Sequence, residues 1–231
     1  MKKKVLIIGG SSDIGQELSK KYLGKEYVLH LHYNKNFNIL KNFKKNFSLI
    51  KADLSSSNLN KILNKFDNDY DIIINLAGYV SSQSFQNFNI KTLEKTLRVN
   101  SIIPLLIIRK SIKKMLKKKW GRITNSSSVG IKFGGGNSSF EYSLSKHFNE
   151  FIPNFMRQLP KKNVFYNVVR IGLTDTKIHK KMKNKDMKTR TKLVPTKRMA
   201  DPKDIAEYIF YISSAKNTFI TSEIVNITGG E

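Results

Sequence analysis

Short apolar runs recur along this chain, separated by turn residues and by stretches with helical spacing. They predict strands at residues 5–8, 27–33, 47–51, 71–75, 121–125, 163–170 and 224–227. Apolar runs of this length are typical of strands that are buried on both faces of a sheet. The fifth run continues into Ser126–Ser128, so we expect hydroxyl groups where that strand ends.

Helical spacing fills most of the intervals between these strands. We expect helices after Gly15, at 59–66, at 90–118 with an interruption around Pro104, around Tyr142 and Lys146, and at 202–213. Asp201 and Pro202 are expected at the N-cap and N1 positions of the last helix. Pro153 should kink the helix of Tyr142 or end it early, because proline cannot donate a helical hydrogen bond.

The alternation of strands and helices predicts an α/β fold. We expect a Rossmann-type, doubly wound parallel sheet with helices on both faces, formed as a single domain by residues 1–231. Ligands of such sheets bind beyond the carboxyl ends of the strands. Five candidate residues lie at the ends of predicted strands or just after them: Gly9, Asp53, Asn75, Ser128 and Gly172.

Composition narrows the possible functions. The chain has no cysteine, four histidines outside any metal-binding motif, and a formal net charge of +25. We therefore expect neither a disulfide nor a metal site. The lysines are scattered and accompany no basic motif interleaved with aromatic residues, so nucleic acid is not the expected partner. Biased composition is the favoured explanation of the charge, with attraction of an acidic substrate or carrier as the alternative.

No targeting or membrane segment is expected. The first apolar run ends in glycines after four residues, which is too short for the apolar core of a signal peptide. No stretch approaches the roughly 20 apolar residues that a membrane helix needs. We expect a cytoplasmic protein without a membrane partner.

Tyr142 and Lys146 are four residues apart, so on a helix they share one face. A nearby ammonium group favours the phenolate and is expected to lower the pKa of Tyr142 from its usual value of about 10. A tyrosine tuned in this way can exchange a proton with a carbonyl or alcohol oxygen. The pair therefore predicts proton-transfer chemistry.

The turn Gly9–Gly15 follows the first strand and opens a helix. Such a turn lets the backbone approach a pyrophosphate group at a helix N-terminus. It resembles the T-G-x-x-x-G-x-G turn of the short-chain dehydrogenase/reductase family, with Ile8 for the threonine and Asp13 for the middle glycine. We expect the Asp13 side chain to cap the helix.

Further resemblances to this family follow in order along nearly the whole chain. The matching segments are Asp53-Leu54, Asn75–Gly78, Arg98–Asn100, Gly121–Ser128, Tyr142–Lys146, Arg170–Gly172, Arg198–Ala206 and Phe219–Gly230. The chain is identified as a member of the family, similar to 3-oxoacyl-[acyl-carrier-protein] reductases. The resemblance implies NAD(P)-dependent hydride transfer between a nicotinamide and a carbonyl or alcohol substrate.

The resemblance also implies a role for individual residues. The implied catalytic residues are Asn100, Ser128, Tyr142 and Lys146, with Ser127 as the alternative to Ser128. The implied cofactor-binding residues are Gly9, Ser11, Ser12, Asp13, Ile14, Gly15, Tyr33, Asn34, Lys35, Asp53, Leu54, Asn75, Ala77, Gly78, Tyr142, Lys146, Gly172, Thr174 and Thr176. Tyr142 would exchange the proton while Ser128 holds the same substrate oxygen. Lys146 would hold the ribose hydroxyls, and Asn100 would anchor a water molecule.

The end of the second strand bears on the choice of cofactor. It reads Tyr33-Asn34-Lys35 and lacks the carboxylate that would accept the ribose 2′-hydroxyl of NAD. Lys35 can pair with a 2′-phosphate instead. We therefore expect NADP(H) rather than NAD(H).

Residues 177–197 lie where the family has a mobile lid over the substrate, and nine of them are basic. We expect a lid here, with a plain solvated loop as the alternative. Members of the family assemble as homodimers or homotetramers, and we expect the same. The expected partner is a small-molecule or carrier-linked carbonyl substrate.

Two other functions remain open. The first is an oxidoreductase of the same family that acts on a sugar or another polar metabolite. The second is a catalytically silent nucleotide- or RNA-binding protein that keeps the fold. The intact set of Asn100, Ser128, Tyr142 and Lys146 favours an enzyme.

Overall fold

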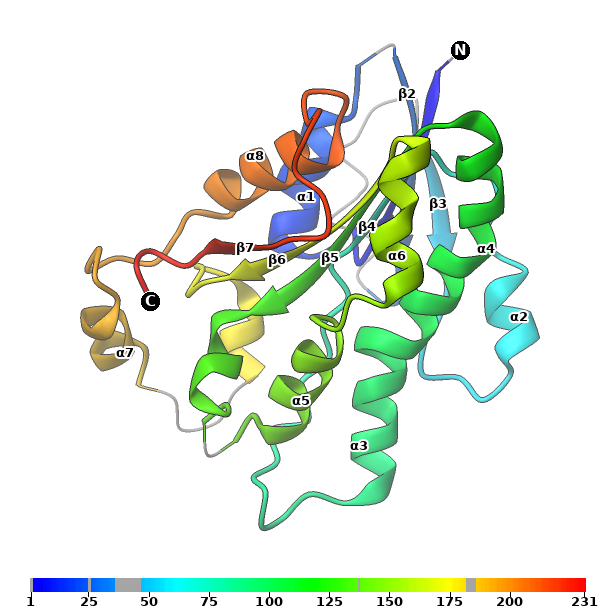
Figure 1. Ribbon diagram of the computed structural model, residues 1–231. Helices are drawn as coiled ribbons and strands as arrows, with labels where there is room; N and C mark the ends of the chain where they lie inside the picture. Colours follow the sequence, from blue (N-terminus) through cyan, green and yellow to red (C-terminus); the bar gives the residue numbers. More distant parts are fainter. Residues whose placement is uncertain (1, 25, 36–46, 137, 182–185) are drawn as a thin grey trace.

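The computed structural model describes residues 2–24, 26–35, 47–136, 138–181 and 186–231. These residues form a seven-stranded sheet in the order β3-β2-β1-β4-β5-β6-β7, in which all paired strands run parallel (Figure 1). The strands are β1 (Lys3–Ile8), β2 (Tyr27–Tyr33), β3 (Phe47–Lys51), β4 (Ile72–Asn75), β5 (Gly121–Ser128), β6 (Val164–Ile171) and β7 (Ile224–Ile227). The predicted doubly wound fold is confirmed.

The strand order reverses between β1 and β4. From β1 the chain winds outward through β2 to β3, and it then returns to begin the other half of the sheet with β4. Ligands of open parallel sheets bind at this kind of reversal, outside the carboxyl ends of the strands. The fold therefore places the candidate site beyond Ile8 and Asn75.

Two hydrophobic cores cover the two faces of the sheet, as the alternation of side chains along β1 illustrates. Leu6 and Ile8 are fully buried in one core, whereas Val5 and Ile7 are fully buried in the other. Successive strand residues point to opposite faces, so a strand covered on both sides must be apolar throughout. This explains why the central strands could be recognised as continuous apolar runs.

The helices lie in two layers (Figure 1). The α-helices are α1 (Asp13–Lys21), α2 (Leu59–Leu63), α3 (Ile90–Leu97), α4 (Ile103–Lys118), α5 (Phe140–Phe148), α6 (Asn154–Gln158), α7 (Met187–Leu193) and α8 (Pro202–Ser213). The short 3₁₀ segments are η3 (Val129–Phe133), η4 (Leu159–Lys162) and η5 (Lys177–Lys181). Helices α1 and α8 pack against each other on one face, and α4 covers the other face with Ile107 and Met115.

The interruption in the long helical region differs from the prediction. It is a π-helix, η2 (Arg98–Ile102), that lies before Pro104, and Pro104 occupies the first turn of α4. Helix η2 runs directly into α4, and the Ile103 N–H bonds back to the Arg98 carbonyl. Proline lacks the N–H that would continue this pattern, and a wider π-turn is a usual place for such a break in the bonding of a helix. The sequence 90–118 keeps helical spacing through the bulge, so only the proline could be read as a break.

Proline and aspartate set the boundaries of two other helices. Helix α5 ends at Phe148, and Pro153 is the N-cap residue of α6, so Pro153 ends the helix of Tyr142 early. Asp201 caps α8 by accepting the N–H of Lys203, and Pro202 is the first helical residue. Both expectations from the sequence are confirmed.

The segment expected as a lid contains a helix that the sequence analysis missed. Helix α7 begins after Asp186, whose carboxylate accepts the N–H groups of Lys188 and Thr189. None of the α7 residues is buried, which explains why no apolar period marks it. Residues 182–185 of this segment lie outside the described residues.

Candidate active site

A cleft of about 1620 Å³ opens at the carboxyl edge of the sheet. That volume exceeds the roughly 300–1,000 Å³ of a pocket for one drug-sized ligand, so there is room for a dinucleotide and a second molecule. The expected residues that line the cleft are Gly9, Ser11, Ser12, Asp13, Ile14, Tyr33, Asn34, Lys35, Asp53, Leu54, Ala77, Gly78, Ser128, Tyr142, Lys146, Gly172, Thr174 and Thr176. The structure thus brings together residues from six of the strand ends.

Three of the expected residues do not line the cleft but lie behind its wall. A Cβ on Gly15 would lie 2.7 Å from the Gly9 carbonyl oxygen, so only glycine lets α1 approach the turn this closely. Asn75 is fully buried; its Oδ1 accepts the Ala77 N–H at 3.0 Å, and its Nδ2 donates to the Asn100 carbonyl. Asn100 is the third of these residues and is also fully buried.

The first turn is capped by a different residue from the one expected. Ser12 is the N-cap of α1, and its Oγ accepts the N–H of Gly15 at 3.1 Å. Asp13 is the first helical residue, and its carboxylate accepts the Lys177 N–H at 2.8 Å. Asp13 therefore joins α1 to the segment after β6, because its side chain points across the cleft instead of back to its own helix.

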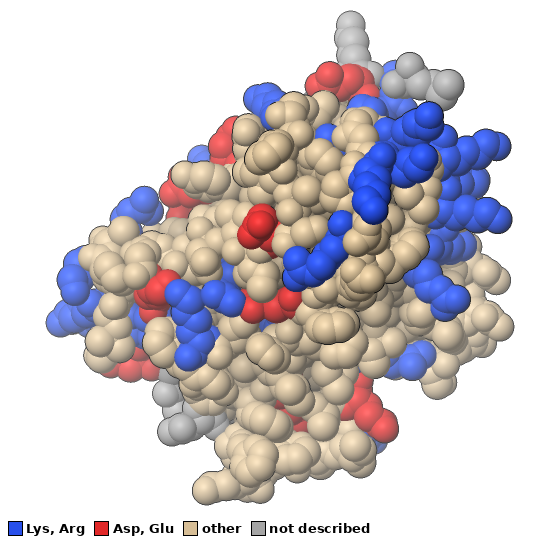
Figure 2. Space-filling model, in the orientation of Figure 1, with Lys and Arg blue, Asp and Glu red and all other residues tan. Residues whose placement is uncertain are grey.

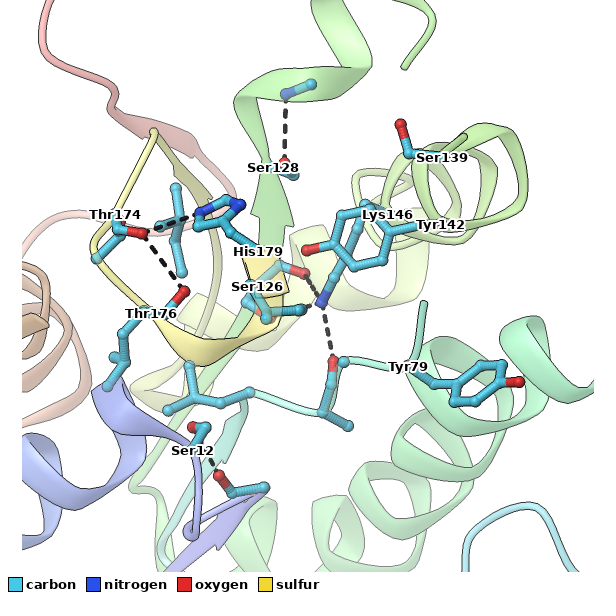
Figure 3. A pocket seen from close by; sticks show the side chains of 18 of the residues that line it. Ser12, Tyr79, Ser126, Ser128, Ser139, Tyr142, Lys146, Thr174, Thr176 and His179 are labelled. Carbon is cyan, nitrogen blue, oxygen red and sulfur yellow. Dashed lines mark hydrogen bonds between the residues drawn. The ribbon is translucent and has the colours of Figure 1, made fainter. Parts of the chain in front are cut away.

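Lys146 reaches the centre of the cleft from α5 (Figure 3). Its Nζ donates to the carbonyl oxygens of Ala77 and Ser126, at 3.0 and 3.3 Å, and to Ser126 Oγ at 3.0 Å. Burial lowers the pKa of Lys146 to about 7, because these neutral oxygens only partly replace the water that solvates an ammonium group. The lysine can therefore gain or lose its proton near neutral pH.

Tyr142 lies one turn before Lys146 and also points into the cleft (Figure 3). Burial raises the pKa of its phenol to about 12, and a hydrogen bond with Ser128 acts in the opposite direction. The expectation that Lys146 lowers this pKa is wrong for the protein without ligands. Nζ lies 5.7 Å from the centre of the Tyr142 ring, and the loss of solvation of the phenolate outweighs its attraction.

The choice between the two candidate serines follows from their contacts. Ser128 interacts with the hydroxyl of Tyr142, and its Oγ accepts the N–H of Gly130 at 3.2 Å. Ser127 is buried and donates to the carbonyl oxygen of Lys146 at 3.2 Å, which fixes α5 against β5. Ser128 is therefore the serine with its hydroxyl in the cleft.

Asn100 lies in the π-helix η2, and its side chain organises the floor of the cleft. Its Oδ1 accepts the Tyr79 N–H at 2.7 Å, and its Nδ2 donates to the Tyr79 carbonyl at 3.0 Å and to Ser145 Oγ at 2.8 Å. Ser145 in turn donates to the carbonyl of Tyr142 at 2.7 Å. The π-helix η2 thus links the loop after β4 to α5, the helix that carries Tyr142.

The segments that follow β3 and β6 form the two ends of the cleft. At the end of β3, Asp53 accepts the N–H and hydroxyl of Ser55, and the hydroxyl bond in particular lowers the pKa of this carboxyl. Lys35 lines the same end of the cleft. At the end of β6, a Cβ on Gly172 would lie 2.6 Å from the Thr228 Cα, and Thr174 Oγ1 donates to the Gly172 carbonyl.

Two contacts at the site were not anticipated from the sequence. Ser126 bonds to Lys146, and it precedes Ser128 by two residues, so strand alternation could have placed both on one face. His32 lines the cleft, and its Nδ1 accepts the Gly9 N–H. Nothing in the local sequence pattern around His32 indicates this partner, which lies 23 residues earlier in the chain.

Comparison with known proteins bears on what this cleft does. The model of the family described as "short chain dehydrogenase" matches residues 3–187, which is most of the chain. The chain belongs to the short-chain dehydrogenase family. It is thus an oxidoreductase of this family, and the resemblance inferred from its motifs is confirmed.

Two relatives illustrate how far the likeness extends. The 3-oxoacyl-[acyl-carrier-protein] reductase of Aquifex aeolicus is 25% identical over 98% of this chain and 86% of its own length. The uncharacterized oxidoreductase YmfI of Bacillus subtilis is 26% identical over 100% of this chain and 99% of its own length. The likeness therefore covers the whole domain.

Solved structures share the fold. ElxO with NADP bound superposes with a TM-score of 0.81 at 24% identity and covers 100% of this chain and 98% of its own. YwfH, an NADPH-dependent reductase involved in bacilysin biosynthesis, gives a TM-score of 0.85 at 19% identity, covering 100% and 98%. At these identities the likeness establishes the fold of the short-chain dehydrogenases.

The described residues contain no group of three or more histidine and acidic side chains arranged to hold a metal ion. No helix among them is long and apolar enough to cross a membrane.

Positive charge is not confined to the cleft. Figure 2 shows basic side chains over α7 and along the edge that α4 forms. The exposed lysines at the end of α4 are Lys113, Lys114, Lys117, Lys118 and Lys119. Positive charge thus covers the surface at α4 as well as the surface at α7.

Replacing Asn100 with alanine should lower both stability and NADPH turnover. The substitution leaves the buried Tyr79 N–H without its acceptor, which costs about 1–3 kcal/mol of unfolding free energy. It also removes the hydrogen bond to Ser145, through which Asn100 is connected to the helix of Tyr142. Chemical denaturation and NADPH oxidation with a carbonyl substrate measure the two effects.

Asn167→Ala is the matched control. Asn167 is equally buried and also bonds to backbone through both side-chain atoms, but it does not line the cleft. It should lose stability and keep its turnover per folded molecule. Equal turnover per folded molecule in both variants would mean that Asn100 has only a structural role.

Proposed function

We propose that this protein is an NADPH-dependent carbonyl reductase that acts on a 3-oxoacyl thioester. One observation carries the proposal: the hydroxyls of Tyr142 and Ser128 and the ammonium of Lys146 face one cleft beside a glycine-rich strand-to-helix turn. A phenol and a second hydroxyl that bond to one another can bind one substrate oxygen from two sides. A dinucleotide in the same cleft would supply hydride from its nicotinamide ring.

The residues of the first turn fit a dinucleotide. Gly9 has a φ of +82°, and a Cβ there would lie 2.9 Å from the main chain of Leu76, so the turn depends on glycine. Removing the side chain lets a pyrophosphate approach the backbone, and the first turn of α1 offers N–H groups without intrahelical partners. Gly9 and Ser12 would thus hold the pyrophosphate.

Tyr142 would donate the proton to the substrate oxygen during reduction. Burial raises the pKa of this phenol to about 12, so the phenol carries its proton at neutral pH. Ser128 would bind the same oxygen and fix it within reach of Tyr142. The pair would stabilise the charge that develops on that oxygen.

Lys146 and Asn100 would support Tyr142. The Lys146 Nζ lies within hydrogen-bond distance of oxygens from two strand ends, where a ribose hydroxyl could share its N–H groups. Its pKa of about 7 lets it pass a proton onward at neutral pH. Asn100 would hold the main chain that borders this route, and with it any water that connects Lys146 to solvent.

The adenine end of the cleft supports NADP(H) over NAD(H). The residues at the end of β2 are Tyr33, Asn34 and Lys35, and none of them carries a carboxylate. The nearby carboxylate, Asp53, is held by Ser55. Lys35 is exposed and free to meet a 2′-phosphate as a charge partner.

The basic segment beyond β6 supports a substrate with negative charge. Lys177, Lys188 and Lys192 are exposed there, and Arg190 lines the cleft. A phosphate-bearing or acidic carrier would be attracted to this surface. Residues 177–197 would then act as the lid that covers the bound acyl chain.

One observation favours a second candidate, a reductase of a polar metabolite. The wall of the cleft beside Tyr142 carries the serines Ser138, Ser139 and Ser143. Hydroxyl groups can bind the hydroxyls of a keto-sugar, which an acyl chain does not offer. NADPH consumption over a panel of 3-oxoacyl thioesters and keto-sugars separates the two candidates. Salt-sensitive RNA binding without any NADPH consumption would instead support a non-catalytic protein.

Tyr142→Phe should abolish turnover and leave NADPH binding intact. The substitution removes the proton donor, and general acid catalysis typically contributes about 10²–10⁴-fold to the rate. NADPH fluorescence titration measures binding, and NADPH oxidation with the best substrate of the panel measures turnover.

Tyr22→Phe provides the matched control. It removes a phenol that bonds to Ser213 in the opposite core, far from the cleft. Turnover should persist in this variant. Wild-type turnover in Tyr142→Phe would refute the proposed role of the phenol.

Lys35→Gln should raise the KM for NADPH and leave that for NADH unchanged, because only NADPH carries the 2′-phosphate. An exposed lysine–phosphate pair is worth about 0.2–1 kcal/mol, so a rise of roughly 1.5- to 5-fold is expected. Lys61→Gln, an exposed lysine on α2 outside the cleft, is the charge-matched control. A wild-type preference for NADH would contradict the assignment.

A further inference from the structure

His32 has no part in the chemistry proposed above, yet it lies beneath the glycine-rich turn that is proposed to bind the dinucleotide. It is the sixth residue of β2, is only 4% exposed, and lines the cleft. Both nitrogens of its ring are hydrogen-bonded. Nδ1 lies 3.1 Å from the Gly9 N, and Nε2 lies 3.0 Å from the Ala52 carbonyl oxygen.

These two partners determine the form of the ring. A carbonyl oxygen can only accept, so Nε2 must carry the hydrogen. A backbone N–H can only donate, so Nδ1 must be bare. The neutral Nε2–H tautomer is the one form that satisfies both bonds. Burial favours the same neutral form and lowers the pKa of His32 to about 4.

The contacts of His32 join two parts of the cleft that are far apart in the sequence. Its ring accepts the N–H of Gly9, and its own carbonyl accepts the N–H of Gly10 at 2.9 Å, so the first two glycines of the turn bond to one residue. On the other side, the ring bonds to Ala52, the residue before Asp53. The turn lies at the pyrophosphate end of the proposed site, and Asp53 lies at its adenine end.

We propose that His32 is a positioning residue that holds the glycine-rich turn and the end of β3 in the geometry that a dinucleotide requires. The proposal rests on the proposed function, since it assumes that the cleft binds a dinucleotide. A site that is already arranged avoids the cost of ordering the turn when the ligand binds. Gly9 has a φ of +82°, and glycine can adopt many other backbone conformations, so contacts such as these restrict it to this one.

Substitutions at His32 test the proposal through cofactor affinity. His32→Leu removes both ring bonds, whereas His32→Asn keeps an acceptor near Gly9 but is too short to reach Ala52. NADPH titration by fluorescence should give a Kd raised about tenfold in His32→Leu, equivalent to about 1.4 kcal/mol, and by less in His32→Asn. At saturating NADPH, kcat should match the wild type, because no reacting group has moved.

His30→Leu is the matched control on the same strand. The ring of His30 bonds to the Tyr70 hydroxyl at 3.2 Å, and His30 does not line the cleft. This variant should lose stability without any change in the Kd of NADPH. An unchanged Kd in His32→Leu, or an equal rise in His30→Leu, would overturn the proposal.

A second measurement uses the unsubstituted protein and needs no ligand. Nitrogen-15 NMR of histidine-labelled protein should show the His32 ring as a single Nε2–H tautomer between pH 6 and 8, a range above its pKa of about 4. A mixture of tautomers would overturn the proposal even if His32→Leu fails to fold. If the wild type binds no dinucleotide but the single tautomer is present, the proposed function fails while the bridge between the turn and β3 stands.

Discussion

The carboxyl edge of the sheet is organised around one buried ammonium group, that of Lys146. Only 2% of this residue is exposed, and its Nζ meets oxygens from the loop after β4 and from β5. These oxygens are neutral, so they satisfy the N–H groups without supplying a full opposite charge. Burial lowers the pKa of Lys146 to about 7, so the group exchanges its proton near neutral pH.

A layer of buried polar side chains maintains this arrangement. Asn149 donates to the carbonyls of Asn100 and Ser126, at 3.2 and 3.1 Å, and Asn75 donates to the same Asn100 carbonyl. The π-helix presents that carbonyl to both amides. Networks of this kind are costly when any member is left unpaired, so the layer holds β4, β5 and α5 in a single relative position. The geometry of the cleft is thus a property of the fold and not of one loop.

The sequence predicted those parts of the molecule whose structure is determined by residues close together in the chain. The strands at 27–33, 47–51 and 224–227 have the bounds that their composition indicated, and Pro153 ends α5 as its chemistry requires. The π-helix escaped prediction because helical spacing continues through residues 98–102. Contacts between distant segments without any local signal, such as that of His32 with the Gly9 N–H, were not predicted either. The pKa of Tyr142 was predicted in the wrong direction, because residue spacing does not report how completely a phenol loses its solvent.

The titration of Lys146 in the protein without ligands tests this account most directly. Carbon-13 NMR of lysine-labelled protein follows the Cε resonance, which Lys146→Met identifies by its loss. Burial among neutral oxygens predicts a midpoint of about 7, well below the usual lysine value of 10.5. A midpoint near 10.5 would mean that the ammonium is solvated or paired with a carboxylate, and it would contradict the arrangement from which the proposed chemistry follows.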